Sequence, residues 1–403
     1  MNRRNWMLSA LAMAAPELGR GQSKLAVRRD ASQMKPDDDA LLLYQAAVRE
    51  MKRRSQKNQL DPLGWYQNGA LHALFCATHD FDLQVHYSWF FLPWHRGYLA
   101  FLEKKMQAVI GEPRLALPYW DWTRSPKIPP TFFGAGNPLA NFTRIQQPTD
   151  TLPADFLDVG PCLRAKSFRF FGGHPKSSIK DEQIEGIVEQ GVHNNTHNWI
   201  GGDMASFPNA GFDPLFCTHH GNVDRLWQAW LAQGDGRANP DDPRFLNHTF
   251  DFHDEKGKPV RVPVRELLSV SNLGYEYDSL AFFPRTLGKT EPRKPVLVQF
   301  ERVELPMHPL SVRVFVSRRG EVISFDPVAP EYVGTFTLLP VGSHNNGGLE
   351  ERVTMQIELS AYASELLRSN TPYEFHLVPV ALRGRPIPTA PLRLRSVKVY
   401  PAT

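Results

Sequence analysis

The segment FDPLFCTHHGNVDRLWQAWLAQG, residues 212–234, has the start and stop signals of a complete helix. Asp213 is a favoured capping residue, Pro214 suits the first turn, and Gly234 is a typical stop. Two consecutive histidines, His219 and His220, lie inside the predicted helix. Consecutive helical residues point about 100° apart, so at most one of these two rings can face a given ion.

A second histidine pair precedes this helix in VHNNTHNWIGG, residues 192–202. A helix predicted over residues 187–199 places His193 and His197 four residues apart and about 40° apart around the axis, so both can reach one ion. An isolated pair with this spacing is more often structural. Zinc proteases need glutamate directly after the first histidine, whereas this chain has Asn194 there, which argues against zinc hydrolysis.

Three more histidines lie upstream in LHALFC and VHYSWFFLPWHRGYL, namely His72, His86 and His95. Pro93 starts a helix that ends at Gly111, which leaves His86 in the segment that enters it. The chain thus offers two trios of imidazoles, the second completed by His219 or His220. All-imidazole trios favour copper over calcium, magnesium or manganese, and the ligand type leaves zinc open.

The rest of the chain indicates two domains, as its 403 residues suggest. Residues 36–57 are acidic at the start and basic at the end, which predicts a fourth, capped helix. From residue 295 onward, six short segments alternate apolar and polar residues between turn residues. This pattern predicts an antiparallel β-sandwich or barrel after a mainly helical domain.

The N-terminal segment MNRRNWMLSALAMAAPELGRG resembles a twin-arginine export signal over residues 1–22, with Arg3 and Arg4 before a short apolar stretch. It predicts a periplasmic or secreted protein; an ordinary N-terminus would leave it cytoplasmic. The net charge of +4 is spread along the chain, so we expect no nucleic-acid partner and no stable membrane association. Three cysteines, Cys76, Cys162 and Cys217, do not suggest a disulfide framework.

The histidine segments resemble a known family. Residues 85–104 are similar to the copper A signature, and residues 213–230 to the copper B signature, of type-3 copper proteins, which comprise tyrosinases, catechol oxidases and molluscan haemocyanins. The similarity is strongest to plant-type polyphenol oxidases and extends from about residue 28 to the C-terminus. It implies a four-helix bundle with a dicopper site over residues 23–290. Residues 291–403 would form a β domain that covers the site and keeps the enzyme latent, although no residue that would enter the site is apparent.

Position by position, the resemblance implies copper A ligands and copper B ligands in the order His72, His86, His95 and His193, His197, His220. The second histidine of the adjacent pair is the one that matches a ligand. Cys76 matches the cysteine that forms a thioether with the second copper A histidine, here His86. A small buried thiol is the plainer interpretation.

The family activity is oxidation of o-diphenols to o-quinones by dioxygen, with ortho-hydroxylation of monophenols in tyrosinases. Glu189 matches a glutamate that holds a water, and Asn194 an asparagine that helps polarise it, which favours tyrosinase activity. The alternative interpretation is that Glu189 is a solvated helix residue and that Asn194 is a loop residue that forms hydrogen bonds. Phe207 matches a gating phenylalanine above copper A or is a core aromatic, and Asn198 occupies a position that influences substrate choice.

Two other functions stay open. A haemocyanin-like oxygen carrier shares this domain pairing, but its thioether cysteine lies close before its histidine, whereas Cys76 and His86 are ten residues apart. An o-aminophenol oxidase would keep the copper pair. By the same resemblance, Asp224 and Arg225 are scaffold residues, and Arg28 or Arg29 packs against one of two tyrosines, Tyr275 or Tyr277.

Overall fold

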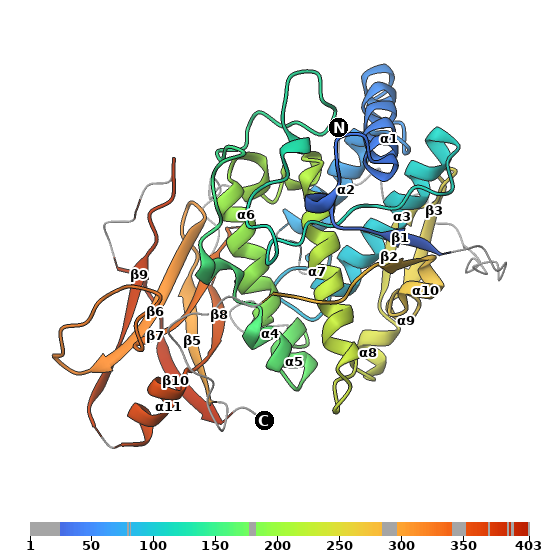
Figure 1. Ribbon diagram of the computed structural model, residues 1–403. Helices are drawn as coiled ribbons and strands as arrows, with labels where there is room; N and C mark the ends of the chain where they lie inside the picture. The colour runs from blue at the N-terminus through green and yellow to red at the C-terminus, as the bar shows by residue number, and fades with distance from the viewer. Residues whose placement is uncertain are drawn as a thin grey trace.

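The computed structural model describes residues 25–78, 80, 82–176, 183–283, 296–340, 352–369, 371–384, 387 and 391–401. Residues up to 283 form a mainly helical part, and residues from 296 onward form a β part beside it (Figure 1). The fold class predicted from the sequence is therefore confirmed. The predicted export segment and the predicted domain boundary at residue 290 lie outside the described residues.

Two of the predicted helices have the expected ends. Helix α1, Asp39–Lys57, begins after Asp38, whose side chain accepts a hydrogen bond from the amide of Ala40. Helix α3, Phe91–Ile110, begins two residues before Pro93 and ends at Gly111 in the left-handed conformation, with φ of 70°. Proline in the first turn and glycine beyond the last turn explain both ends of α3.

The two helices that carry the second histidine trio differ in regularity. Helix α7, Leu215–Ala232, is continuous, and Asp213 accepts a hydrogen bond from the Leu215 amide at 2.8 Å, as a capping residue does. The helix predicted over residues 187–199 is present but is not a regular α-helix. A π-helical turn, Glu189–His193, precedes helix α6, Asn194–Ile200, because Gly191 leaves the helical region with φ of −94° and ψ of −111°.

Helix α2, Trp65–Cys76, was not predicted, because its buried residues surround it and leave no amphipathic stripe. It packs against the 3₁₀ turn Ala210–Phe212 so closely that a Cβ atom at Gly69 would lie 2.2 Å from the ring of Phe212. The helices that carry histidines are thus α2, α3, α6 and α7, and α1 packs on the outside of α2 and α3.

Shorter elements complete the helical part: helices α4 Gly160–Arg164, α5 Phe168–Gly172, α8 Pro243–Leu246, α9 Val264–Leu267 and α10 Val270–Leu273, and strands β1 Ala26–Arg28, β2 Thr249–His253, β3 Pro259–Pro263 and β4 Tyr275–Tyr277. Strand β1 pairs with β4 in parallel, and β2 pairs with β3 antiparallel. None of the described helices is long and apolar enough to cross a membrane.

A buried charge network fixes the helices on which the histidines lie. The guanidinium of Arg28 stacks 3.5 Å from the ring centre of Tyr275, so the predicted cation–π contact is present. The hydroxyl groups of Tyr275 and Tyr277 each donate to Asp224 of α7 at 2.6 Å, and Arg96 of α3 donates to the same carboxylate at 2.6 Å. Asp224 therefore ties α7 to α3 and to β4.

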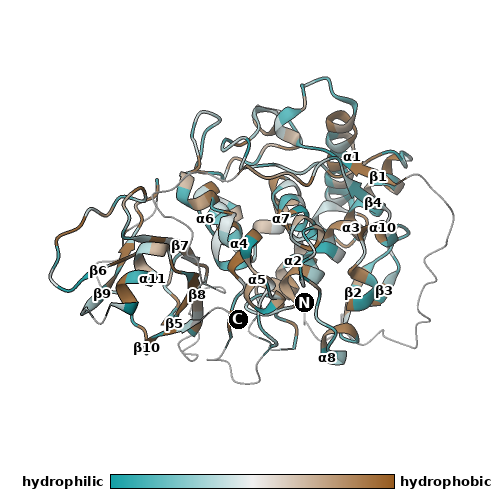
Figure 2. Ribbon diagram, turned by 60° about the horizontal axis from the view of Figure 1, so that its bottom comes forward, coloured by the Kyte–Doolittle hydropathy of each residue, from teal (hydrophilic) through white to brown (hydrophobic). Residues whose placement is uncertain are grey.

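The described residues of the β part form six strands at the six segments predicted from alternation: β5 Val296–Glu304, β6 Leu310–Arg318, β7 Tyr332–Leu338, β8 Arg352–Glu358, β9 Tyr373–Pro379 and β10 Ser396–Pro401. They form two three-stranded antiparallel sheets, β10-β5-β8 and β7-β6-β9, and helix α11, Ala361–Arg368, follows β8. Phe300 of one sheet contacts Phe336 and Phe375 of the other, as in a sandwich. Figure 2 shows hydrophobic residues on the helices and strands of both parts.

The two parts are joined by a buried apolar core and by polar contacts. Buried apolar residues from both parts belong to one contiguous cluster. Arg313 of β6 donates to both carboxylate oxygens of Asp155 at 2.9 and 3.1 Å. Arg164 of α4 pairs with Glu358 of β8 at 2.6 Å. Strands β6 and β7 lie against α6, the helix that carries His197 and directly follows His193.

Candidate metal centre

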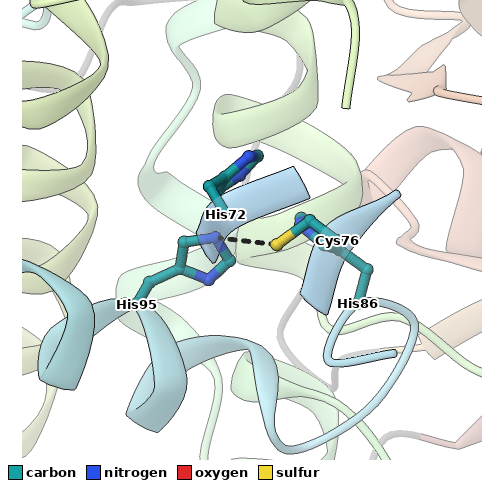
Figure 3. Close-up of side chains that lie close together, drawn as sticks. All are labelled: His72, Cys76, His86 and His95. Carbon is teal, nitrogen blue, oxygen red and sulfur yellow. Dashed lines mark hydrogen bonds between the residues drawn. The ribbon is translucent and has the colours of Figure 1, made fainter. Parts of the chain in front are cut away.

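Two clusters of potential metal-ligating side chains occur among the described residues, namely His72, Cys76, His86 and His95, and His193, His197, His219 and His220. The ligand atoms within each cluster lie within 4.8 Å of one another. Figure 3 shows the first cluster, in which α2, α3 and the intervening loop each contribute side chains. The structure thus brings both predicted histidine trios together, each with one additional side chain.

The ring nitrogens of the second trio are spaced for one metal ion. The Nε2 atom of His220 lies 3.3 Å from Nε2 of His193 and 3.1 Å from Nε2 of His197. An imidazole nitrogen lies about 2.0 Å from a bound first-row ion, and tetrahedral angles then separate two such nitrogens by about 3.3 Å. An all-imidazole donor set of this kind fits copper or zinc better than a hard cation.

Hydrogen bonds at Nδ1 orient four of the six rings and leave Nε2 for an ion. The acceptors are the carbonyls of Phe91 for His95 at 2.8 Å and of Met204 for His197 at 2.5 Å, Asn194 Oδ1 for His193 at 2.8 Å, and Glu189 Oε1 for His86 at 2.8 Å. The buried Nε2 atom of His86 has no hydrogen-bond partner. These bonds fix ring orientation before any ion arrives.

The environment keeps these histidines uncharged. Burial lowers the pKa of His86 to about 3 and the pKa of His197 to about 4, and it lowers the pKa values of the other four rings as well. Neutral imidazole is the form that binds metals. All six rings are therefore in the neutral form that can bind a metal cation.

Glu189 contacts the first trio directly. Its Oε1 accepts hydrogen bonds from His86 Nδ1 at 2.8 Å and from the amide of Tyr87 at 3.0 Å, whereas its buried Oε2 has no partner. Burial raises the pKa of Glu189 and lowers that of His86, so we describe their contact as a hydrogen bond and not as an ion pair. Glu189 thus forms a hydrogen bond with a histidine of the first trio through one carboxyl oxygen, and its other carboxyl oxygen can accept a further hydrogen bond.

Three asparagines of α6 contact the β part, namely Asn194, Asn195 and Asn198. The amide nitrogen of Asn194 donates to Glu185 and to the Thr337 carbonyl, each at 3.1 Å. Asn198 donates to Ser311 at 2.9 Å and does not line the pocket at the histidines. None of these contacts was predicted. The contacts with Thr337 and Ser311 join residues more than one hundred positions apart, and the contact with Glu185 spans the π-helical turn.

A pocket lies directly on the histidines and is largely covered. Phe207 lines it with its ring 4.4 Å from that of His86, and Leu339, which follows β7, lines it from the β part. Phe207 and Leu339 are only 7% and 5% exposed. The Tyr87 hydroxyl donates to the Leu339 carbonyl at 2.7 Å. Leu339 is thus the pocket-lining residue that comes from the β part, and it was not predicted from the sequence.

Each cluster contains one side chain in addition to its histidine trio, Cys76 in the first and His219 in the second. Cys76 Sγ lies 3.9 Å from Nε2 of His95 and in the same cluster as His86 (Figure 3). Both ring nitrogens of the buried His219 have no hydrogen-bond partner, and its ring stacks on His193. The resemblance favours His220 as the ligand, and the close contacts of its Nε2 with both other nitrogens agree with it.

Glu185 is the main residue at the site that reasoning from the sequence missed. It lies four positions before Glu189 and eight before His193, a spacing that places three functional side chains on one helical face. That spacing is the available signal, although the π-helical turn changes the face. Leu339 and Thr337 carry no local signal, because only tertiary packing brings them to the site.

Comparisons with known proteins agree with the site. Residues 62–161 and 140–233 match the model of the common central domain of tyrosinase, and residues 239–285 match that of the polyphenol oxidase middle domain. Catechol oxidase B, chloroplastic, of Solanum tuberosum is 32% identical, and the match covers 86% of this chain and 72% of that protein. Polyphenol oxidase E, chloroplastic, of Solanum lycopersicum is also 32% identical, over 63% of this chain.

The chain spans about half the length of several of these relatives, as the 49% coverage of the Solanum lycopersicum protein shows. The structure of latent apple tyrosinase superimposes with a TM-score of 0.78 at 23% identity, covering 96% of this chain and 99% of that chain. That likeness shows a shared fold that includes the β part. With two histidine trios that fit a dinuclear copper site, the chain belongs to the type-3 copper family of plant-type polyphenol oxidases.

Proposed function

We propose that the protein is a copper-dependent phenol oxidase that converts o-diphenols to o-quinones with dioxygen and also hydroxylates monophenols at the ortho position. The observation that carries this proposal is the pair of buried, neutral histidine trios around one pocket. His72, His86 and His95 would hold one copper ion, and His193, His197 and His220 the other. Copper bound there would supply electron transfer between the phenol and dioxygen.

The remaining residues of the pocket would bind and orient the phenol. Phe207 offers an aromatic face beside His86, and the buried walls exclude water from the reacting groups. A phenol has a pKa near 10, so hydroxylation requires help with loss of its proton. Glu189 contacts His86 and has one buried carboxyl oxygen without a hydrogen-bond partner, and we assign it this task.

Oxygen uptake with paired substrates tests the proposal. Copper-loaded protein should consume oxygen with catechol and with 4-hydroxyphenyl substrates. Glu189→Ala should reduce monophenol turnover per bound copper much more than catechol turnover, because a catechol is already dihydroxylated. Equal losses would exclude the proton-accepting role of Glu189. Uptake confined to o-aminophenol would indicate an aminophenol oxidase, and reversible oxygen binding without turnover an oxygen carrier.

We further propose that the β part, assigned to residues 291–403, is a lid and that Leu339 fills the substrate position. Leu339 lines the pocket together with five ligand histidines, and its carbonyl is held by Tyr87. In this arrangement a phenol cannot occupy the same space as the leucine side chain. Replacing Leu339 with alanine should raise catechol oxidation by the full chain, whereas an unchanged rate would exclude a blocking role.

The twin-arginine resemblance supports export of the folded protein by residues 1–22, and we retain it as a proposal. A folded precursor suits an enzyme that acquires its metal before export. The two relatives named above are chloroplastic proteins, whereas the resemblance to a twin-arginine signal predicts export for this chain. A reporter fused after residue 15 should reach the periplasm, and cytoplasmic retention would contradict export.

A further inference from the structure

Glu185 is a second buried carboxyl group beside the metal centre and is not part of the functions assigned above. Its side chain is 0% exposed and belongs to the segment just before the π-helical turn. Oε2 accepts a hydrogen bond from the Asn194 side-chain amide at 3.1 Å, and Oε1 has no hydrogen-bond partner. Burying a carboxyl group costs free energy, so a buried glutamate with only one hydrogen-bond partner is expected to have a function.

The contact with Glu185 fixes which way the Asn194 amide faces. The amide nitrogen is a donor, and it points to two acceptors, Glu185 Oε2 and the carbonyl of Thr337. The amide oxygen is then directed to Nδ1 of His193 at 2.8 Å. If the amide turned over, its nitrogen would face His193, and its oxygen would face the Thr337 carbonyl, which has no hydrogen to share in any state, and the Glu185 carboxyl group, which has none when ionised.

The direction of this amide decides the tautomer of His193. With the Asn194 oxygen facing it, Nδ1 carries the ring hydrogen, and Nε2 keeps its lone pair for the ion. With the amide nitrogen facing it, Nδ1 would become the acceptor and Nε2 would carry the hydrogen. A neutral imidazole cannot bind a metal through a protonated nitrogen, so the second arrangement opposes binding at His193.

The two acceptors that hold the amide belong to different parts of the molecule. Thr337 lies on β7, in the part that we propose as a lid, whereas Glu185 lies in the helical part. When the lid moves away to admit a phenol, Thr337 moves with it. Glu185 then becomes the acceptor that keeps the amide in place. Burial and the neighbouring Glu189 raise the pKa of Glu185, and either protonation state retains an accepting oxygen for Asn194.

We propose that Glu185 is a positioning residue for the second copper ion: through the Asn194 amide it holds His193 in the tautomer that binds the metal. The inference deepens the proposed function and relies on it for the identity of the ion. Residues that orient ligand histidines typically change metal affinity by about 10- to 100-fold when they are replaced. Because the Thr337 carbonyl also accepts in the closed chain, we expect about tenfold in the full-length protein.

The test measures copper in full-length variants. Apo-protein is titrated with copper against a competing chelator, copper per chain is determined by elemental analysis, and cupric copper is recorded by electron paramagnetic resonance. Glu185→Leu should bind the second ion about tenfold more weakly than the wild type. At limiting copper it should show the signal of a single cupric ion, because a coupled pair is silent. Glu185→Gln keeps an accepting oxygen and should restore most of the affinity.

Two further variants keep the test decisive. Glu185→Asp withdraws the carboxylate by one methylene and should weaken the second ion in the same direction, even if the leucine variant fails to fold. Arg164→Met weakens the domain contact at Glu358 and has no contact with Asn194, so it should retain both ions. Wild-type affinity for two ions in Glu185→Asp and in folded Glu185→Leu would overturn the inference. A wild type without two ions would instead refute the proposed function.

Discussion

Cys76 lies where two ligand histidines of the first trio meet. Its sulfur is 3.9 Å from Nε2 of His95, and it shares a cluster with His86, the ring to which the resemblance assigns a thioether. A thioether would restrict the rotation of His86, whose Nδ1 is already held by Glu189. Two histidines of the first trio thus lie near the sulfur, and peptide mapping distinguishes a bond to His86 from a bond to His95.

Intact mass tests the thioether. Copper-loaded wild type exposed to dioxygen should be lighter than its sequence mass by two hydrogen atoms, because forming the bond removes one from the thiol and one from the ring, and dioxygen, the oxidant of the proposed function, takes up both electrons and both protons. Cys76→Ser should show the full sequence mass. Peptide mapping should join Cys76 to His86. A wild type with full mass would refute the bond, and a peptide that joins Cys76 to His95 would correct the assignment.

Single residues differ in how far their roles follow from the sequence. The six histidines are predictable, because helical spacing pairs His193 with His197 and the family signatures supply the others. Glu185 and Leu339 were not predicted. We propose that Glu185 acts through the Asn194 amide, and Leu339 directly follows strand β7, more than one hundred residues after the histidines in the sequence. Neither relation leaves a local pattern in the chain.

Helices and strands were predictable where one of their faces is exposed to solvent and the other is buried. Helix α1 and the six strands have amphipathic patterns and were predicted, whereas α2 is buried around most of its surface and was not. The break at Gly191 was missed because glycine within a helical pattern lowers the expected stability of the helix without indicating a π-helical turn. Buried elements at functional sites are thus the least visible in sequence.

Helix α3 contains a buried lysine whose charge should make stability depend on pH. Burial lowers the pKa of Lys105 to about 7, and its ammonium group contacts Asn68. The unfolded chain holds that proton up to a pKa of about 10.4, so between pH 7 and 10 the unfolded state binds more protons than the folded state. The free energy of unfolding should therefore rise with pH across this window, by up to about 1.4 kcal/mol for each pKa unit.

Denaturant unfolding at several pH values tests this effect. Lys105→Met should lose most of the rise between pH 7 and 10, because no ionisable group remains at that position. The exposed Lys57 at the end of α1 provides the matched control, and Lys57→Met should keep the wild-type pH dependence. Identical pH dependence in Lys105→Met and the wild type would show that this lysine does not titrate as described.

At the scale of the whole molecule, the β part covers the metal centre. Alternation of apolar and polar residues predicted its strands but contained no information about the surface on which they dock. The structure places β6 and β7 against α6, where Ser311 bonds to Asn198 and Thr337 bonds to Asn194. The asparagines proposed to take part in substrate chemistry are therefore engaged by the β part, which we propose as a lid.

Asp155 should control how readily the lid opens. It is buried and accepts hydrogen bonds from Arg313 and Thr335 of the β part. Hydrogen bonds to charged groups contribute about 1.5–3 kcal/mol, and 1.4 kcal/mol is tenfold in an equilibrium constant. Asp155→Ala should therefore increase the open population, and with it catechol oxidation by the full chain, by about tenfold or more.

An exposed pair offers the control for Asp155. Arg383 contacts Asp150 across the same two parts, but its side chain is 56% exposed, and pairs of this kind contribute little. Arg383→Ala should leave catechol oxidation unchanged. Folded Asp155→Ala protein with wild-type activity would contradict control of the lid by this carboxylate.

Copper stoichiometry tests the central claim most directly. Elemental analysis of purified, copper-loaded protein should give two ions per chain for the wild type and for His219→Ala, and one for His220→Ala, because only His220 brings its Nε2 within 3.3 Å of both partner nitrogens. A wild type that binds fewer than two copper ions would contradict a dinuclear centre. Loss of an ion in His219→Ala but not in His220→Ala would contradict the ligand assignment.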